Sequence, residues 1–350
     1  MTSRQFDIGT AIFYFFKRFG ENPGGAIWIA LCQAALVAVL VAGAFAIMIP
    51  AWENLVELVM LEESGRLSEE EAVARVFAMM GPSLIVLTLA SPVAIVCALM
   101  FQGAWLRFLT HGEVKPGIPF RIGGDEIRLL GVNLLYIALA IAAYAVVAVI
   151  FVVTGVGAAF WIEGSGHDVG AGIGAGLMMM TVVLAVMVAA LIVAVKLASA
   201  PAMSVRERRF RFFESWSATK GVFWHMLVSY AAVAVMMLVI STILGFFVQI
   251  LLLGAMWPLI NEIIQLDMAG GASDPQQVFD MLGNYFSHPG TIAVLIAVFL
   301  AGYAVQIALE GMWHGVGAYN AVRNDGGESR DLDAPTLEDG HPMGSSPSEG

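Results

Sequence analysis

Residues 131–154 read GVNLLYIALAIAAYAVVAVIFVVT, a run without a single Asp, Glu, Lys or Arg. A helix rises about 1.5 Å per residue, so about 20 apolar residues cross a hydrocarbon core roughly 30 Å thick. Lipid cannot hydrogen-bond to the backbone, and a helix satisfies its own backbone groups. The stretch therefore predicts a membrane-spanning helix.

Five further apolar runs of similar length lie on either side of this one. Hydrophobic residues make up 59% of the 350 residues and charged residues 13%, whereas a soluble domain has about 25% charged residues. The sequence therefore predicts an all-α, polytopic membrane protein with six transmembrane helices. The predicted spans are residues 27–50, 83–105, 131–154, 176–198, 222–250 and 291–313.

The basic residues predict which side of the membrane each loop faces. Residues 155–175 and 251–290 contain no Lys or Arg, and residues 51–82 contain only Arg66 and Arg75 beside seven glutamates. Lys and Arg near span ends stay in the cytoplasm. We therefore expect both termini to lie in the cytoplasm. The net charge of −11 comes mainly from the acidic tail and the first outer loop, and it indicates no nucleic-acid partner.

The six spans resemble three copies of a two-span hairpin. Gly-Ala-Ile-Trp at 25–28 corresponds to Gly-Val-Phe-Trp at 221–224, and Gln-Gly-Ala-Trp at 102–105 corresponds to Glu-Gly-Met-Trp at 310–313. The middle unit keeps the layout but not these letters. We expect one transmembrane domain over residues 1–323, in units of about 1–110, 111–200 and 201–323, and a disordered acidic tail over 324–350.

Three cytoplasmic segments, 5–20, 120–130 and 205–220, precede the odd-numbered spans. The third reads VRERRFRFFESWSATK, in which aromatic rings recur at helical spacing among arginines. Such a segment can lie in the interface with its rings toward acyl chains and its cations on anionic headgroups. The alternative is a basic anchor that only orients the chain. The candidate headgroup contacts are Arg206, Arg208, Arg209, Arg211 and Lys220.

Two ionisable residues fall inside predicted spans, Lys196 and Glu310, and such residues are costly in lipid. Lys196 is close enough to the span end to extend to the interface. Glu310 occupies the repeat position of Gln102, which predicts an intramembrane polar site made of Glu310, Gln102 and Lys196. A Glu310–Lys196 ion pair is a further alternative. The sequence contains no recognisable catalytic or metal-binding motif, so we expect neither an enzyme nor a cofactor.

The fourth span and its exit resemble a known family. Lys-Leu-Ala-Ser-Ala-Pro at 196–201 and Glu-Ser-Trp-Ser-Ala-Thr-Lys-Gly-Val-Phe-Trp at 214–224 are similar to the membrane domain attached to some glycerophosphoryl diester phosphodiesterases. Small bacterial six-span proteins share that domain. The close match covers about thirty residues and the layout extends it loosely over 1–325. The His-Arg-Gly and Glu-Asn-Thr motifs of the hydrolase domain are absent, so the resemblance implies a membrane module that contacts lipids or partner proteins.

The sequence thus favours a non-enzymatic inner-membrane protein that contacts anionic lipid, a protein partner or a second copy of itself, with a role in envelope maintenance. The alternative is a transporter or channel subunit for a small solute or ion, because Gln33, Asn133, Gln249 and Gln306 also lie in spans. Residues 251–266 are open to two interpretations. They lie along the outer surface, or they prolong the fifth span.

Overall fold

The structure, a computed structural model, describes residues 6–63, 69–115, 117–164, 169–268 and 275–324. Within these ranges the chain forms helices and no strand. The tail was predicted over 324–350; Asn324 is the last residue of a helix, and residues 325–350 lie outside the described residues. The helices are α1 (Ile8–Glu21), α2 (Pro23–Glu63), α3 (Glu69–His111), α4 (Gly124–Gly164), α5 (Val169–Leu197), α6 (Ala200–Arg206), α7 (Glu214–Ala218), α8 (Phe223–Met268), α9 (Pro275–Ser287) and α10 (Pro289–Asn324).

The prediction of an all-α, polytopic membrane protein is confirmed. Six stretches, on α2, α3, α4, α5 with α6, α8 and α10, are long and apolar enough to cross a membrane. Few of their residues are buried within the molecule, and large apolar side chains stand exposed along them, as at Leu89 (73% exposed), Tyr144 (77%) and Leu238 (68%). Exposure of this kind is stable in lipid and not in water.

The helices extend well beyond the predicted spans. α8 has 46 residues, which corresponds to about 69 Å, or about twice the hydrocarbon thickness. The predicted outer loops at 155–175 and 251–290 are therefore mostly helix, and residues 251–266 prolong the fifth span. The loops were inferred from a change in polarity, and polarity indicates where water begins but not where a helix ends.

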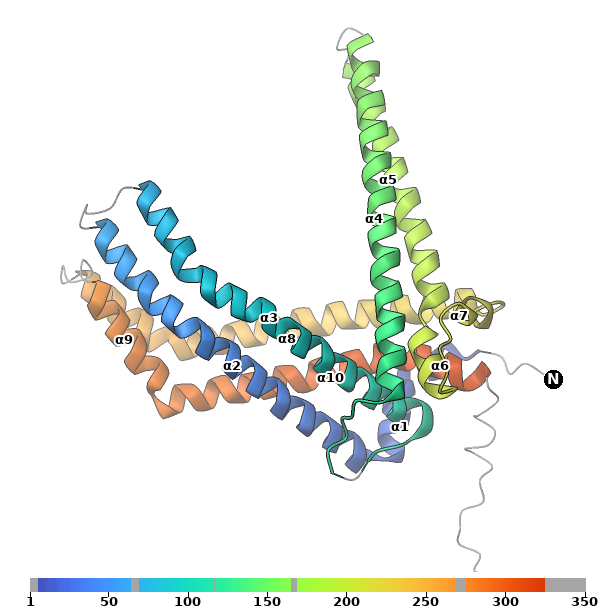
Figure 1. The fold of residues 1–350 in the computed structure, drawn as a ribbon, viewed down its shortest axis with the longest axis horizontal. Helices are drawn as coiled ribbons and strands as arrows, with labels where there is room; N and C mark the ends of the chain where they lie inside the picture. The colour runs from blue at the N-terminus through green and yellow to red at the C-terminus, as the bar shows by residue number, and fades with distance from the viewer. Residues whose placement is uncertain (1–5, 64–68, 116, 165–168, 269–274, 325–350) are drawn as a thin grey trace, which may run out of the picture.

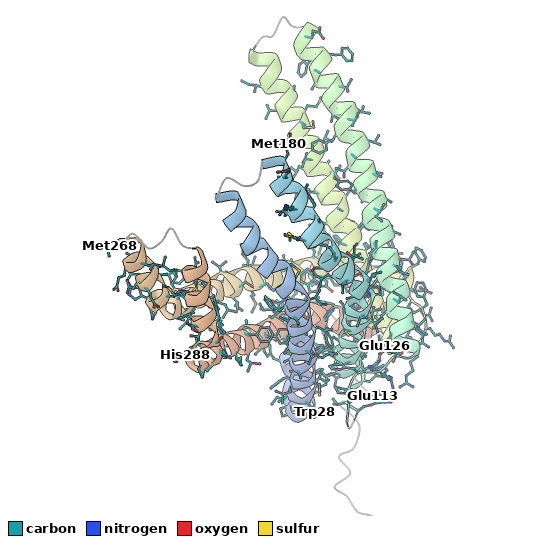
Figure 2. The ribbon with its side chains drawn as sticks, turned by 60° about the vertical axis from the view of Figure 1, so that its left-hand side comes forward. Trp28, Glu113, Glu126, Met180, Met268 and His288 are labelled. Carbon is teal, nitrogen blue, oxygen red and sulfur yellow. The ribbon has the colours of Figure 1, made fainter. Side chains whose placement is uncertain are left out.

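The spans pair as three antiparallel hairpins, α2 with α3, α4 with α5, and α8 with α10. Figure 1 shows these hairpins diverging from one end of the molecule, where α1, α6 and α7 gather. We call this end the base; it corresponds to the predicted cytoplasmic side. In Figure 2, Trp28, Glu113 and Glu126 lie together at the base, and Met180 and Met268 lie far along the hairpins.

Helix α6 is the centre of the base. Its residues from Ala200 to Val205 are all buried, between α3, α4 and α10. The residue before it, Ser199, accepts a hydrogen bond from the buried amide of Asn320 at 3.0 Å. Gly317 on α10 approaches so closely that a Cβ there would lie 2.9 Å from the carbonyl oxygen of Ala198. Small residues thus allow α10 to cross in close contact with the N-terminal end of α6.

The contacts at the base close into a ring. The end of α3 packs closely on the start of α4, as shown by Gly103, where a Cβ would lie 2.7 Å from the Glu126 carboxylate. The end of α5 meets α7, where the Ser215 hydroxyl donates to the Lys196 carbonyl at 3.0 Å. The end of α10 meets α1, so each returning helix contacts the segment that precedes the next hairpin, and the last contacts the first.

The predicted interfacial segments differ in structure. α1 buries Ala11, Tyr14 and Phe15 against its neighbours, mainly α10 and α8, and exposes Phe13 and Phe16. Residues 120–130 form no separate helix, because they lead into and begin α4. The third segment is divided between α6, a turn and α7.

Candidate functional site

Residues 208–220 form an exposed surface of rings and cations at the base. Phe210, Phe213 and Trp216 expose 44%, 71% and 47% of their surface. Among the cations, Arg208, Arg209 and Lys220 are exposed. We call these six residues the aromatic–basic segment.

One buried ring explains why this segment faces outward. Phe212 is 1% exposed and packs edge-on against Tyr136 of α4, with ring centroids 5.3 Å apart. Arg208 adopts a φ of 53°, a left-handed conformation that ends α6 and reverses the chain. The Arg211 backbone N–H then donates to Ser204 at 3.1 Å. With Phe212 anchored inward, the rings of Phe210 and Phe213 remain exposed.

The structure divides the five candidate headgroup contacts into two groups. Arg206 donates to the carbonyl of Thr110 at the end of α3, and Arg211 pairs with Glu207 at 2.7 Å and Glu214 at 3.1 Å. The hydrogen bond that Arg211 donates to Glu214 and the negative charge of Glu207 raise the pKa of Arg211. Both guanidiniums are thus engaged within the protein.

The other three cations are more available. Arg208 forms a solvent-exposed pair with Glu113 at 3.1 Å, which contributes little to stability. Arg209 and Lys220 form no ion pair with any residue that the structure describes.

Lys196 lies apart from Glu310 and next to this segment. Its ammonium stands 5.5 Å from the Trp216 ring and 5.4 Å from the Phe223 ring. A cation over two ring faces is stabilised by their quadrupoles. Over the described ranges no Lys196–Glu310 ion pair is found. Lys196 and the Ser215-Trp216 stretch, which belong to one sequence motif, are therefore also in contact in the structure.

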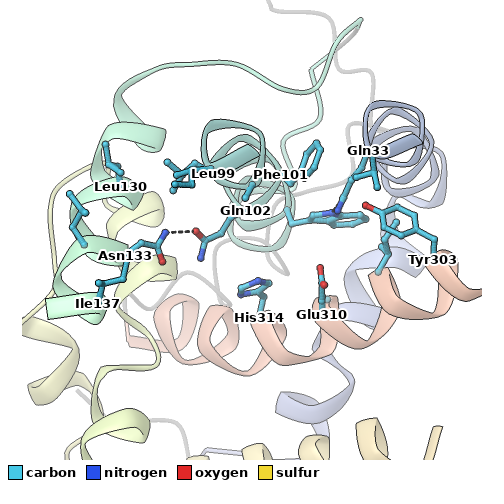
Figure 3. Close-up of a pocket in the computed structure, with 17 residues that line it drawn as sticks. Gln33, Leu99, Phe101, Gln102, Leu130, Asn133, Ile137, Tyr303, Glu310 and His314 are labelled. Atoms are coloured by element: carbon cyan, nitrogen blue, oxygen red, sulfur yellow. Dashed lines mark hydrogen bonds between the residues drawn. The ribbon is translucent and has the colours of Figure 1, made fainter. Parts of the chain in front are cut away.

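Glu310 and Gln102, the other two members of the predicted intramembrane site, line one cavity of about 620 Å³. The cavity lies between α2, α3, α4 and α10 near the base. Figure 3 shows Glu310 and His314 pointing into it from α10, opposite Gln102. The lining residues are Gln33, Val37, Ile95, Ala98, Leu99, Phe101, Gln102, Trp105, Leu130, Asn133, Leu134, Ile137, Tyr303, Ile307, Glu310, Gly311 and His314.

The amides of the cavity are largely satisfied by other helices. Asn133 on α4 donates to Gln102 on α3 at 2.8 Å (Figure 3), and Trp105 donates to Gln33 on α2 at 2.7 Å. These are the interhelical hydrogen bonds expected for polar residues in spans. Among the residues that the structure describes, Glu310 accepts a hydrogen bond only from Gln306, one turn earlier on α10, at 2.8 Å.

Sequence reasoning missed two features here. His314 lines the cavity. Its position four residues after Glu310 places both side chains on one face of a helix, so the sequence spacing could have indicated it. The other is a buried ion cluster beside the cavity, in which Arg107 pairs with Glu126 at 2.5 Å and with Asp125 at 3.4 Å. Only the fold brings α3 and α4 together there.

Among the residues that the structure describes, no group of three or more His, Cys, Asp or Glu side chains is arranged to hold a metal ion. The described residues place exposed rings and cations at the base and the carboxylate of Glu310 in the cavity. No protein-family model, curated protein or solved structure matches the chain. The resemblance to the phosphodiesterase membrane domain stays a prediction.

Proposed function

We propose that this integral membrane protein binds anionic lipid headgroups of the cytoplasmic leaflet through the aromatic–basic segment, as a non-enzymatic component in the maintenance of the bacterial envelope. The observation that carries the proposal is the joint exposure of three rings and three cations on one short stretch, 208–220. Rings of this kind insert at the acyl boundary and cations bind headgroup phosphates.

The alternative of a simple orienting anchor is less well supported by this geometry. An anchor requires only positive charge near a span end, and the paired Arg206 and Arg211 already supply it. Exposed rings add nothing to orientation, whereas they do add apolar area that can enter the interface. The buried Phe212, which holds Phe210 and Phe213 outward, also favours a built lipid-facing surface.

The test measures lipid preference in the purified protein. Native mass spectrometry compares retention of phosphatidylglycerol and phosphatidylcholine with identical acyl chains. The variant Arg209→Gln/Lys220→Gln removes the two cations that form no ion pair with any described residue, and we expect it to lose the preference for the anionic lipid. Each headgroup contact of an exposed cation contributes about 1 kcal/mol, so the loss for two is roughly 10- to 30-fold.

The matched control is Arg75→Gln/Lys115→Gln, which removes two exposed basic residues elsewhere. It should leave the anionic preference unchanged. An equal loss in both double variants would reduce the effect to net charge and count against a specific surface. No preference for phosphatidylglycerol in the unaltered protein would exclude the proposal outright.

A transporter or channel subunit is the second candidate, and one observation favours it. Polar residues from four helices, including Gln33, Gln102, Asn133 and Glu310, meet in one cavity. A flux assay in proteoliposomes tests this function, comparing the unaltered protein with Glu310→Ala. Flux that depends on Glu310 supports it. Absent flux of ions and small solutes, or flux indifferent to the substitution, argues against it.

A further inference from the structure

We propose that the cavity between α2, α3, α4 and α10 is a binding site for an aminophospholipid of the surrounding leaflet. The lipid ammonium contacts Glu310, and an acyl chain follows the apolar wall away from the base. The site is separate from the aromatic–basic segment and uses none of its residues, so it stands or falls independently of anionic-lipid binding.

The charge of the cavity selects a cation. Among its 17 lining residues Glu310 is the only carboxylate, and none is Lys or Arg. One carboxylate oxygen accepts from Gln306; the other has no hydrogen bond from any residue that the structure describes. Next to lipid, an uncompensated carboxylate is costly and a positive partner is strongly favoured. A headgroup whose net charge is negative would instead be repelled.

The cavity is polar near the base and apolar farther from it, as a lipid is polar at its headgroup and apolar along its acyl chains. On α4, Asn133 is followed one turn farther from the base by Ile137. On α10, Glu310 is followed by Ile307 in the same direction, and on α3, Gln102 gives way to Ile95. The headgroup level is therefore polar, and the wall beyond it is aliphatic apart from the Tyr303 ring on α10.

The cavity opens to the membrane and not only to water. Ile95, Leu134 and Ile137 line it, yet each is more than half exposed (55%, 54% and 55%). They belong to α3 and α4, whose hairpins diverge from the base in Figure 1. A lipid can enter between these hairpins with its chain, which is the reason to prefer a membrane lipid to a free amine.

The size is suitable for this occupant. A volume of about 620 Å³ lies within the range of about 300–1,000 Å³ typical of small-molecule sites. It accommodates a headgroup and the first part of a chain, with the remainder of the lipid left in the bilayer. His314, one turn nearer the base than Glu310 and pointing into the same cavity (Figure 3), is placed to hydrogen-bond to the headgroup phosphate.

The experiment is native mass spectrometry of the purified full chain, titrated with phosphatidylethanolamine or phosphatidylglycerol of identical acyl chains. In the Arg209→Gln/Lys220→Gln background, where the aromatic–basic segment no longer favours phosphatidylglycerol, the protein should retain one phosphatidylethanolamine more strongly than phosphatidylglycerol. The isosteric Glu310→Gln should reduce its retention by about 10-fold or more, the effect of one lost hydrogen bond to a charged group. Soluble ethanolamine in excess should not displace the lipid.

A second pair of variants separates binding from folding. Ala98 lines the cavity. Ala90 lies two turns farther from the base on α3 and does not line the cavity. Ala98→Trp fills the cavity and should abolish retention, whereas Ala90→Trp should retain the lipid. The double variant Arg209→Gln/Lys220→Gln should also retain it, which keeps this test distinct from the one for anionic lipid.

Three outcomes would overturn the proposal. The first is equal retention of both lipids by the Arg209→Gln/Lys220→Gln variant, in which the aromatic–basic segment no longer favours phosphatidylglycerol. The second is undiminished phosphatidylethanolamine retention in Glu310→Gln or Ala98→Trp. The third is displacement of the lipid by soluble ethanolamine, which would identify the ligand as a free amine.

Discussion

The Phe15 ring on α1 packs directly against Gly311 on α10, so closely that a Cβ at residue 311 would overlap carbon atoms of the ring. This contact joins the first helix of the chain to the last. Phe15 is 3% exposed and packs against Trp105 as well, with ring centroids 5.7 Å apart. The closed circle of helix contacts at the base is therefore completed at Gly311, where any larger residue would collide with the Phe15 side chain.

We predict that Gly311→Ala destabilises the protein. Ala favours a helix by about 1 kcal/mol over Gly, but overpacking a filled site costs about 1–3 kcal/mol, and the Phe15 ring is buried against Trp105. Thermal unfolding in detergent measures the change. Gly302→Ala on the same helix is the control, because nothing lies within 4 Å of its Cβ position; it should be neutral or stabilising. Equal effects at both positions would refute the close contact.

The buried cluster at the start of α4 gives a second prediction. Arg107 and Glu126 are 5% and 4% exposed, and removing one member of a buried pair costs about 3–5 kcal/mol. We expect Arg107→Ala to lower the stability by that order. The control Arg121→Gln breaks a partly exposed bond to Asp125 and should cost at most about 1 kcal/mol. Chemical unfolding followed by circular dichroism distinguishes the two.

A third prediction concerns the start of α1. Asp7 caps the helix by accepting from the Thr10 backbone N–H at 2.6 Å, and hydrogen bonds from the Thr10 side chain and backbone lower the pKa of Asp7 below 3.8. A carboxyl whose pKa is lowered in the folded state contributes stability above its unfolded pKa, and loses it as pH falls through the folded value. Asp7→Ala should cost about 1 kcal/mol at neutral pH.

Asp7→Asn is the informative partner variant. Asn caps helices about as well as Asp but does not titrate. We expect near-normal stability at neutral pH and a smaller loss than the unaltered protein when the pH is lowered from about 4 toward 2. Identical acid sensitivity in both proteins would mean that Asp7 does not contribute to it.

The position of Lys196 between two rings gives a fourth prediction. Lys196→Arg should be tolerated, since a guanidinium also stacks on rings, whereas Lys196→Met should cost about 0.5–2 kcal/mol. If Lys196 instead paired with Glu310, the charge-swapped double variant Lys196→Glu/Glu310→Lys would restore stability lost in the single variants. We expect no such rescue in thermal unfolding.

The orientation is tested by cysteine labelling in cells. Gly164 ends α4 away from the base and Lys220 lies exposed at the base, and the native Cys32 and Cys97 are half-buried and buried. An impermeant maleimide should label Gly164→Cys in intact cells and Lys220→Cys only after permeabilisation. The reverse pattern would place the base, and with it the aromatic–basic segment, outside the cell.

The amino-acid sequence alone determined the class of this protein and its six spans. Those properties follow from the number of consecutive apolar residues, because the bilayer thickness sets a minimum length that can be counted. It also singled out Glu310 and Gln102 together, since each opens a similar Gly-containing tetrapeptide. The lengths of the helices were not determined, because loops were inferred from polarity and the helices continue past the apolar runs.

Only the tertiary structure decided which polar residues share a site. Lys196 in the fourth predicted span and Glu310 in the sixth both lie near the cytoplasmic end of their span, yet Lys196 stacks on Trp216 and Phe223 while Glu310 faces a cavity with Gln102. The reason is physical: hydropathy reports a residue's depth in the membrane, but its rotation about the helix axis and the neighbour it meets depend on how α3, α4, α6 and α10 pack at the base.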